Sequence, residues 1–279
     1  MERPSNCWTA ELCDGIRIGS IAAVVMLLGA CGSGSSSSGA SDKATACLNA
    51  DLYDVGTHVV QSALSATEAL YTDSTVQQNT SFNNVSSLTE TEALEETGFP
   101  QIPELIFQTE THQRYTRLDG KTLLKFGDVT TAPLGNDLVL ADYLAAIGLP
   151  ADQLAPVVTT VTHNPPLELR FDLSPGQSYT QSYTSSTNTS ITIEPATIPL
   201  IVFDTATSST TTYVGRESVT VPAGTFEACK FIDAVTTPGG TATTTTWLAV
   251  GSGLTLKSED GSGKLTELVS ASINGIPVQ

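Results

Sequence analysis

The chain has 279 residues, 40% of them hydrophobic, and a formal net charge of -17 at pH 7. A chain of this length and apolar content can bury a core, so a folded body is expected. Nucleic-acid binding is not expected, because phosphate contacts need clustered Lys and Arg and only 12 of these residues are present.

The first element is a short apolar run near the N-terminus. Residues 18–29 are apolar or small, and as a helix they would span roughly 18 Å against a hydrocarbon core of roughly 30 Å. The run predicts the apolar region of a signal peptide, with Arg17 as its nearest positive flank. Glu2, Glu11 and Asp14 leave the leader without clear positive charge, which a later translation start would partly explain.

The apolar run ends at Leu28-Gly29-Ala30-Cys31, which resembles the lipobox of bacterial lipoproteins. A thiolate at Cys31 is nucleophilic enough to be alkylated by a lipid donor. The resemblance implies a lipidated Cys31, acyl chains of the palmitate type and loss of residues 1–30. Because Gly32 rather than Asp follows the cysteine, it also implies the outer membrane, with the body facing the periplasm or the cell surface. The alternative is an ordinary cysteine just past a cleaved secretory signal.

Residues 31–41 are rich in Gly and Ser and are expected to form a flexible tether. Residues 42–279 are then a single β-rich globular domain. Once the leader is lost and Cys31 is lipidated, only Cys47 and Cys229 remain. These two can form a disulfide in an oxidising compartment. Two buried free thiols are the alternative.

The first part of the body is predicted to be partly helical. Over residues 42–71 the apolar side chains Val59, Val60, Leu64 and Leu70 recur near helical spacing. Residues 73–98 are polar and acidic, so a solvated loop or helix face is expected there. A β-hairpin is predicted next, because Asp119-Gly120 is a turn dipeptide between two strand-like runs. An amphipathic helix is predicted over Leu138–Ile147.

From Val157 onward, candidate strands recur at intervals of about ten to fifteen residues, with Pro, Gly, Asn and Asp between them. The predicted fold class is mainly β (α+β), an antiparallel meander forming a curved sheet or half-open barrel with one or two short helices. Alternation places Phe226 and Ala228 on one face of a strand and Cys229 and Phe231 on the other. An N-terminal segment is expected to cross the face that carries Cys229.

A resemblance covers residues 217–260. The stretches VTVPAGTFEACKF and WLAVGSGLTLKSE are similar to a paired signature of uncharacterised bacterial envelope lipoproteins, a VPAGTF-type turn followed by a Trp-led hairpin. These proteins are similar in plan to half-open barrels of the lipoprotein-carrier type, whose concave sheet can hold acyl chains. The resemblance implies no settled activity.

The chain shows no catalytic, cofactor or metal signature. EDGSGKL lacks the first glycine and the hydroxyl of a phosphate loop, and NADLYDVG has Asp54 where a calcium loop needs glycine. The three histidines lie far apart in the sequence, and no Gly-x-Ser-x-Gly motif is present. We therefore assign no catalytic residues, metal ligands or cofactor and do not expect an enzyme. His112 or His163 beside two carboxylates in one cleft would reopen that question.

Two functional hypotheses remain. The first is a membrane-anchored, non-enzymatic binding or structural module that contacts another envelope component, for example an envelope protein. The alternative is a carrier or sensor of an apolar ligand such as lipid. The carrier predicts a dry pocket in the concave face of the sheet, lined by Phe171, Phe203, Phe231 and Trp247.

Overall fold

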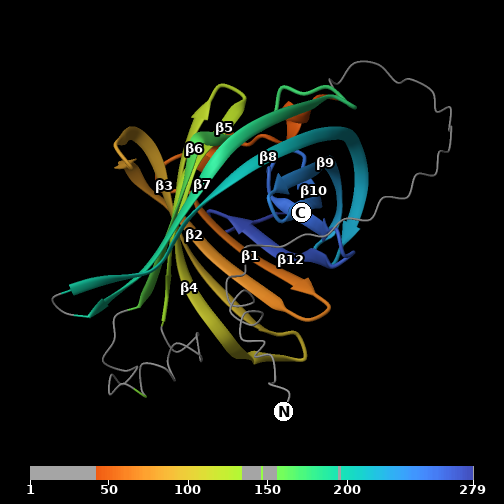
Figure 1. Ribbon diagram of the computed structural model, residues 1–279. Helices are drawn as coiled ribbons and strands as arrows, with labels where there is room; N and C mark the ends of the chain where they lie inside the picture. Colours follow the sequence, from red (N-terminus) through yellow and green to blue (C-terminus); the bar gives the residue numbers. More distant parts are fainter. Residues whose placement is uncertain (1–41, 134–145, 147–155, 194–195, 279) are drawn as a thin grey trace, which may run out of the picture.

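The computed structural model describes residues 42–133, 146, 156–193 and 196–278. These residues form thirteen strands that pair in chain order as one antiparallel meander (Figure 1). The strands are β1 (His58–Ser65), β2 (Ala69–Phe82), β3 (Val85–Phe99), β4 (Ile102–Asp119), β5 (Thr122–Ala132), β6 (Val157–Arg170), β7 (Ser178–Ile193), β8 (Ala196–Val221), β9 (Gly224–Thr237), β10 (Gly240–Ala249), β11 (Thr255–Asp260), β12 (Leu265–Ile273) and β13 (Ile276–Pro277). The prediction of a mainly β antiparallel meander is confirmed.

The meander closes into a barrel. β12 pairs with β1 in an antiparallel register that runs from Val59 opposite Ile273 to Ser65 opposite Thr266. The predicted half-open barrel is therefore closed, with twelve strands around the ring. Closure removes the two open sheet edges that a curved sheet would expose.

The N-terminal part of the body differs from the prediction. Residues 42–71 contain two short 3-10 turns, η1 (Ala44–Cys47) and η2 (Ala50–Tyr53), and then strand β1, in place of a helix. The acidic stretch within 73–98 lies in β2 and β3, where we expected a loop or helix face. Each of these strands pairs with a neighbour on both sides, and this pairing overrides the weak helical spacing.

The predicted hairpin around Asp119-Gly120 is confirmed, with Asp119 opposite Thr122 and Gly120 at a φ of 58°. The sequence indicated strands over residues 114–118 and 121–126, whereas β4 begins at Ile102 and β5 ends at Ala132. The predicted helix Leu138–Ile147 lies outside the described residues except for Ala146. Among the described residues, no helix is long and apolar enough to cross a membrane.

Strand β9 is buried on both faces, as its alternation predicted. Cys229 and Phe231 belong to one apolar cluster, together with η1. Phe226 and Ala228 belong to a second cluster, which packs against β11 and β12. The strand therefore separates two layers of the core.

The connections alternate between the two ends of the barrel, because consecutive strands are antiparallel. We call the end with the β6–β7 and β10–β11 connections the plug end, because η1 is held there. The backbone N–H of Ala44 donates to the carbonyl of Leu173 at 3.0 Å, and that of Gly251 donates to the carbonyl of Ala46 at 2.8 Å. The β3–β4 and β7–β8 turns lie at the opposite end, which we call the distal end.

Candidate functional site

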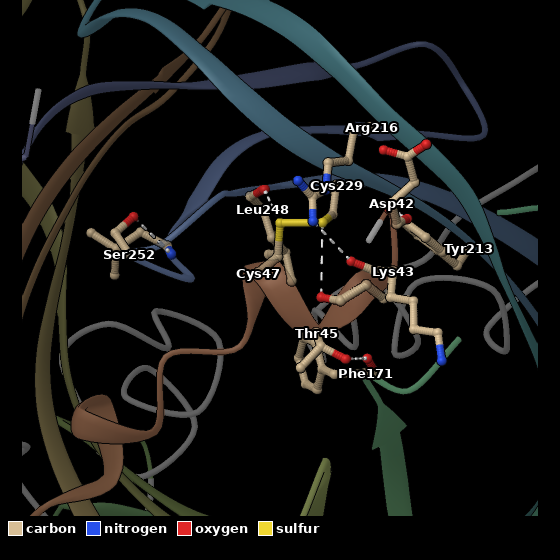
Figure 2. Close-up of a disulfide and its surroundings, with 12 residues drawn as sticks. Asp42, Lys43, Thr45, Cys47, Phe171, Tyr213, Arg216, Cys229, Leu248 and Ser252 are labelled. Atoms are coloured by element: carbon tan, nitrogen blue, oxygen red, sulfur yellow. Dashed lines mark hydrogen bonds between the residues drawn. A yellow bond between two sulfur atoms is a disulfide. The ribbon is translucent and has the colours of Figure 1, made fainter. Parts of the chain in front are cut away.

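The predicted disulfide is present. Cys47 in η1 is bonded to Cys229 in β9 across 182 residues, with a Cα–Cα distance of 6.2 Å (Figure 2). Hydrogen bonds flank the bridge on both sides. The Tyr213 hydroxyl donates to the carbonyl of Asp42 at 2.7 Å, and the Thr45 hydroxyl donates to the carbonyl of Phe171 at 2.7 Å. The start of the described chain is thus fixed to three strands or connections of the barrel.

This N-terminal segment fills space in the core. Ala44 and Cys47 are 0% and 1% exposed, and they pack in one cluster with Tyr213, Phe231 and Phe171. The ring centroids of Phe171 and Phe231 lie 6.1 Å apart, and those of Tyr213 and Phe231 lie 5.1 Å apart. The apolar surface that these rings offer is therefore covered by the chain itself.

Of the four residues predicted to line a ligand pocket, only two come together. Phe171 and Phe231 share the cluster around the disulfide, whereas Trp247 lies in the second cluster, on the other side of β9. Phe203 is half-buried in β8, opposite Thr187 of β7. The residues therefore do not outline one concavity.

Trp247 is held by charged neighbours. The ammonium groups of Lys230 and Lys257 lie 4.9 Å and 5.3 Å from the centroid of its ring, a cation–π geometry. Its indole N–H donates to the carboxylate of Glu217. The ring is only 6% exposed, so it acts as packing between strands.

A small, partly open cavity of about 190 Å³ has a largely apolar surface. Its lining comes from β1, β2, β11 and β12 and includes Ala63, Leu70, Leu256 and Leu268. Pockets that hold drug-sized ligands usually exceed roughly 300 Å³. A larger, open hollow of about 510 Å³ lies over β6 to β9; many of its lining residues are Ser and Thr, but its exposed surface is also largely apolar.

A polar cluster that the sequence did not reveal lies on β3, β4 and β5. Nε2 of His112 is 3.2 Å from Oε2 of Glu110 and 3.5 Å from Oε2 of Glu95. Nδ1 of the same ring is 3.1 Å from the hydroxyl of Thr130. The guanidinium of Arg114 pairs with Glu95. The cluster is half-buried, since the side chains of His112 and both glutamates are about one-fifth exposed.

Strand register explains why these residues meet. Glu95 stands opposite Glu110, and His112 stands opposite Thr130, so all four point to one face. The hydrogen bond to His112 lowers the pKa of the Glu110 carboxyl, and a bond from Gln108 acts in the same direction. The usable signal in the sequence was the period-two alternation of polar residues in β3 and β4.

The same face continues as a row of hydroxyl groups. Thr130 stands opposite Thr159, which stands opposite Thr189. The hydroxyls of Thr159 and Thr189 are 3.0 Å apart. Other threonines and serines of this face are buried, namely Thr187, Thr207, Ser209 and Thr211. Apolar side chains share this face, because Ile191, which is 2% exposed, and Phe203 lie on it as well.

The His112 cluster contains the histidine with two carboxylates that would reopen the question of an enzyme. The polar atoms of this cluster are, however, already hydrogen-bonded. Arg114 donates to the Glu95 carboxylate, Gln108 donates to the Glu110 carboxylate, and the Thr130 hydroxyl bonds the second ring nitrogen of His112. The arrangement pairs the negative carboxylates of Glu95 and Glu110 with Arg114 and His112. Within the part of the chain that the structure describes, no three or more His, Cys, Asp or Glu side chains are placed to hold a metal ion. Cys31, the predicted lipidation site, lies outside the described residues.

Comparison with known proteins gives two structural similarities. No family model and no curated protein matches the chain. The first similarity is to a protein from Bacteroides fragilis NCTC 9343 described as exported and YmcC-like in fold, at a TM-score of 0.39, 16% identity, 78% coverage of this chain and 96% of the other. The second is to a protein from Parabacteroides distasonis ATCC 8503 described as a lipoprotein, at a TM-score of 0.34, 16% identity and coverages of 79% and 96%.

Proposed function

We propose that the protein is an exported lipoprotein of the bacterial envelope, anchored in the outer membrane through acyl chains on Cys31. Its barrel serves as a non-enzymatic binding or structural module. The observation that supports this most is the disulfide between Cys47 and Cys229. Structural disulfides persist in oxidising compartments such as the periplasm. This bridge is buried, since Cys47 and Cys229 are 1% and 0% exposed, which supports a structural role.

The position of the bridge suits a tethered body. The proposed tether runs from Cys31 to Asp42, where the Tyr213 hydroxyl holds the first described carbonyl. Five residues later, Cys47 is covalently joined to β9. Force applied through the tether is thus transmitted to the core by a covalent bond, and the N-terminal segment stays attached to the barrel at Cys47.

A binding or structural role is better supported than the carrier of an apolar ligand. The rings of Phe171 and Phe231 are covered by η1, and the apolar cavity of about 190 Å³ is too small for an acyl chain of ordinary length. The hollow over β6 to β9 is open to solvent. Neither of these two spaces is an enclosed apolar pocket of the size that a carrier would need.

Metabolic labelling with radioactive palmitate tests the anchor. We expect label on the wild-type chain and none on a Cys31→Ser variant. Cys13→Ser is the matched control, because Cys13 lies in the leader, and it should leave labelling unchanged. Equal labelling of the wild-type and Cys31→Ser chains would contradict the proposal.

Membrane fractionation tests the location. The wild-type protein should sediment with outer-membrane markers. Gly32→Asp changes the residue after the lipidated cysteine and is expected to retain labelled protein in the inner membrane. Recovery of both forms in the same fraction would rule out sorting by this position.

A further inference from the structure

Two hairpins at the distal end carry large apolar side chains in solvent. The first joins β3 to β4, where Phe99, Ile102, Leu105, Ile106 and Phe107 are between 39% and 52% exposed. The rings of Phe99 and Phe107 touch, with centroids 5.0 Å apart. This cluster contrasts with the rest of a chain that has a net charge of -17.

The second hairpin joins β7 to β8. Ile198, Leu200 and Val202 are 42%, 39% and 68% exposed, and they belong to an uninterrupted apolar run over residues 198–203. The two turns lie at the same end of the barrel, because each follows an odd-numbered strand of the meander. In Figure 1 the β7–β8 hairpin extends away from the body at the lower left. We call the eight side chains of the two hairpins the apolar tips.

Both tips project beyond the closed barrel. β4 pairs with β5 only from Thr111 onward, and β8 pairs with β9 only from Ser208 onward. Within the described register, the outer segment 102–110 therefore pairs with β3 alone, and the outer segment 196–207 pairs with β7 alone. In the second hairpin, Ile198 stands opposite Ile191 and Val202 opposite Asn188. Because residues three apart in a strand point to opposite faces, this hairpin is apolar on both faces.

We propose that the apolar tips insert into the interface of a lipid bilayer and give the protein a membrane contact independent of Cys31. A protein partner or a second copy would cover one face of a hairpin, whereas a bilayer surrounds both faces. Charge favours the same occupant. Glu104 is the only charged residue in 99–107, and 197–203 has none. The contact therefore matches neutral, zwitterionic headgroups and needs no basic residues.

The backbone limits the depth of insertion. The outer edges of these hairpins carry N–H and C=O groups that need hydrogen bonds, which the hydrocarbon core cannot supply. The tips are thus expected to lie about 5–10 Å deep, at the boundary of headgroups and acyl chains, where water remains available.

The tether is long enough for the anchor and the tips to reach one bilayer. The twelve residues from Cys31 to Asp42 reach at most about 40 Å, and Asp42 is bonded to Tyr213 in β8. From Tyr213 to Val202 the strand extends about 36 Å. Contact of the tips with the bilayer would therefore orient a body that the tether alone leaves free to turn.

Vesicle flotation tests the proposal with residues 42–279, which contain the complete closed barrel and its disulfide but neither Cys31 nor the leader. With phosphatidylcholine vesicles, the protein should float equally at about 0.15 M and about 1 M NaCl, because no ion pairs with lipid are involved. Ile106→Asp and Val202→Asp should each lower the partition coefficient about tenfold, and together about a hundredfold. Ile276→Asp is the matched control: Ile276 is 72% exposed but lies at the plug end, and binding should not change.

Three results would overturn the proposal. One is a wild-type protein that does not float, and another is an equal loss of binding with Ile276→Asp. The third is self-association of the wild type in sedimentation equilibrium that the tip substitutions abolish, since a second copy would then be the occupant. This experiment uses a chain without Cys31, so its failure would not contradict the proposed lipid anchor. Failed palmitate labelling would likewise not contradict membrane insertion of the apolar tips.

Discussion

Nε2 of His112 lies 3.2 Å from Oε2 of Glu110, which precedes it by two residues in β4. Residues two apart in a strand point to the same face, so the strand itself holds this pair together. Thr130 on β5 fixes the other ring nitrogen from the next strand. The geometry is that of a charge-balancing cluster between strands.

Replacing this carboxylate should weaken the fold in a pH-dependent way. We expect Glu110→Gln to lower the free energy of unfolding by about 1 kcal/mol at pH 7, since a half-buried hydrogen bond to a charged group is lost. The pKa of Glu110 is lowered from its ordinary value of 4.5 in the folded protein. Its stabilisation is therefore complete above pH 4.5 and disappears as the pH falls through the lower, folded value.

Urea unfolding of wild type and variant at a series of pH values measures this effect. The difference between the two should shrink below pH 4.5. Glu104→Gln is the control on the same strand, because Glu104 is exposed, and it should match the wild type throughout. A constant difference down to pH 3 would show that the lost stability is not electrostatic.

Local turn chemistry and alternation predicted part of this fold. Asp119-Gly120 marked the β4–β5 turn, although only Gly120 takes a positive φ there and Asp119 ends β4 opposite Thr122. Alternation around Phe226 showed that Cys229 faces a separate layer. Both are properties of neighbours in sequence. The disulfide followed from the cysteine count, with free thiols as the alternative.

Long-range pairing accounts for what the sequence did not predict. Barrel closure joins Val59 to Ile273, and nothing local in either strand specifies that register. The helical spacing of residues 42–71 was misleading because pairing on both sides of β1 outweighs it. The polar cluster escaped notice for the same reason: Glu95 meets His112 only through the register of β3 and β4.

Removal of the disulfide should destabilise the whole protein. The bridge closes a loop of 182 residues, and the double variant Cys47→Ala, Cys229→Ala is expected to lose about 2–5 kcal/mol of unfolding free energy. The closed barrel should remain folded, because its strand pairing does not depend on the bridge. Residues 44–53 should become the first site of proteolysis, since their remaining hold on the barrel is non-covalent.

Guanidinium denaturation and limited proteolysis with mass spectrometry measure both effects. Reducing agent should destabilise the wild type and leave the double variant unchanged, which controls for effects of the reagent. Cleavage that begins elsewhere, with 44–53 still protected, would show that the hydrogen bonds alone secure the segment.

His163 in β6 should make stability depend on pH above the range of the carboxylates. Its Nδ1 is 3.1 Å from the hydroxyl of Ser185, and its ring packs edge-on against Tyr183 at 5.5 Å. Burial, and then the charge of Lys125, lowers the pKa of His163 from 6.5 to about 4, while Asp128 opposes the shift. The stabilisation by the neutral His163 ring is complete above pH 6.5. It falls as the pH drops below this value, because the unfolded chain takes up a proton while the folded protein does not.

We expect a loss of about 1 kcal/mol between pH 7 and pH 5 after allowance for solvent screening. His163→Gln should remove this slope. His58→Gln should retain it, because the side chain of His58 is 41% exposed and lies on β1, away from this site. Urea midpoints at pH 7, 6 and 5 give the comparison, and a slope that survives in His163→Gln would assign the pH dependence to another group.

Gly127 in β5 should tolerate no side chain. A Cβ at this position would lie 2.1 Å from the carbonyl oxygen of Val161 and 2.7 Å from the ring of Phe82. The carbonyl belongs to the neighbouring strand β6 and cannot move without breaking the ladder. Phe82 is itself stacked on Tyr115, with ring centroids 4.2 Å apart, so its displacement would disturb the cluster on that face.

Gly127→Ala is therefore expected to cost about 3 kcal/mol or more of unfolding free energy, near the upper end of overpacking. Gly239→Ala is the matched control: its nearest neighbour is the hydroxyl of Thr237 at 3.6 Å, an ordinary contact, so the change should stay within about 0.5 kcal/mol. Chemical denaturation of both variants measures the two changes in unfolding free energy. If Gly127→Ala were as stable as Gly239→Ala, β5 and β6 could not approach as closely as the register of this barrel requires.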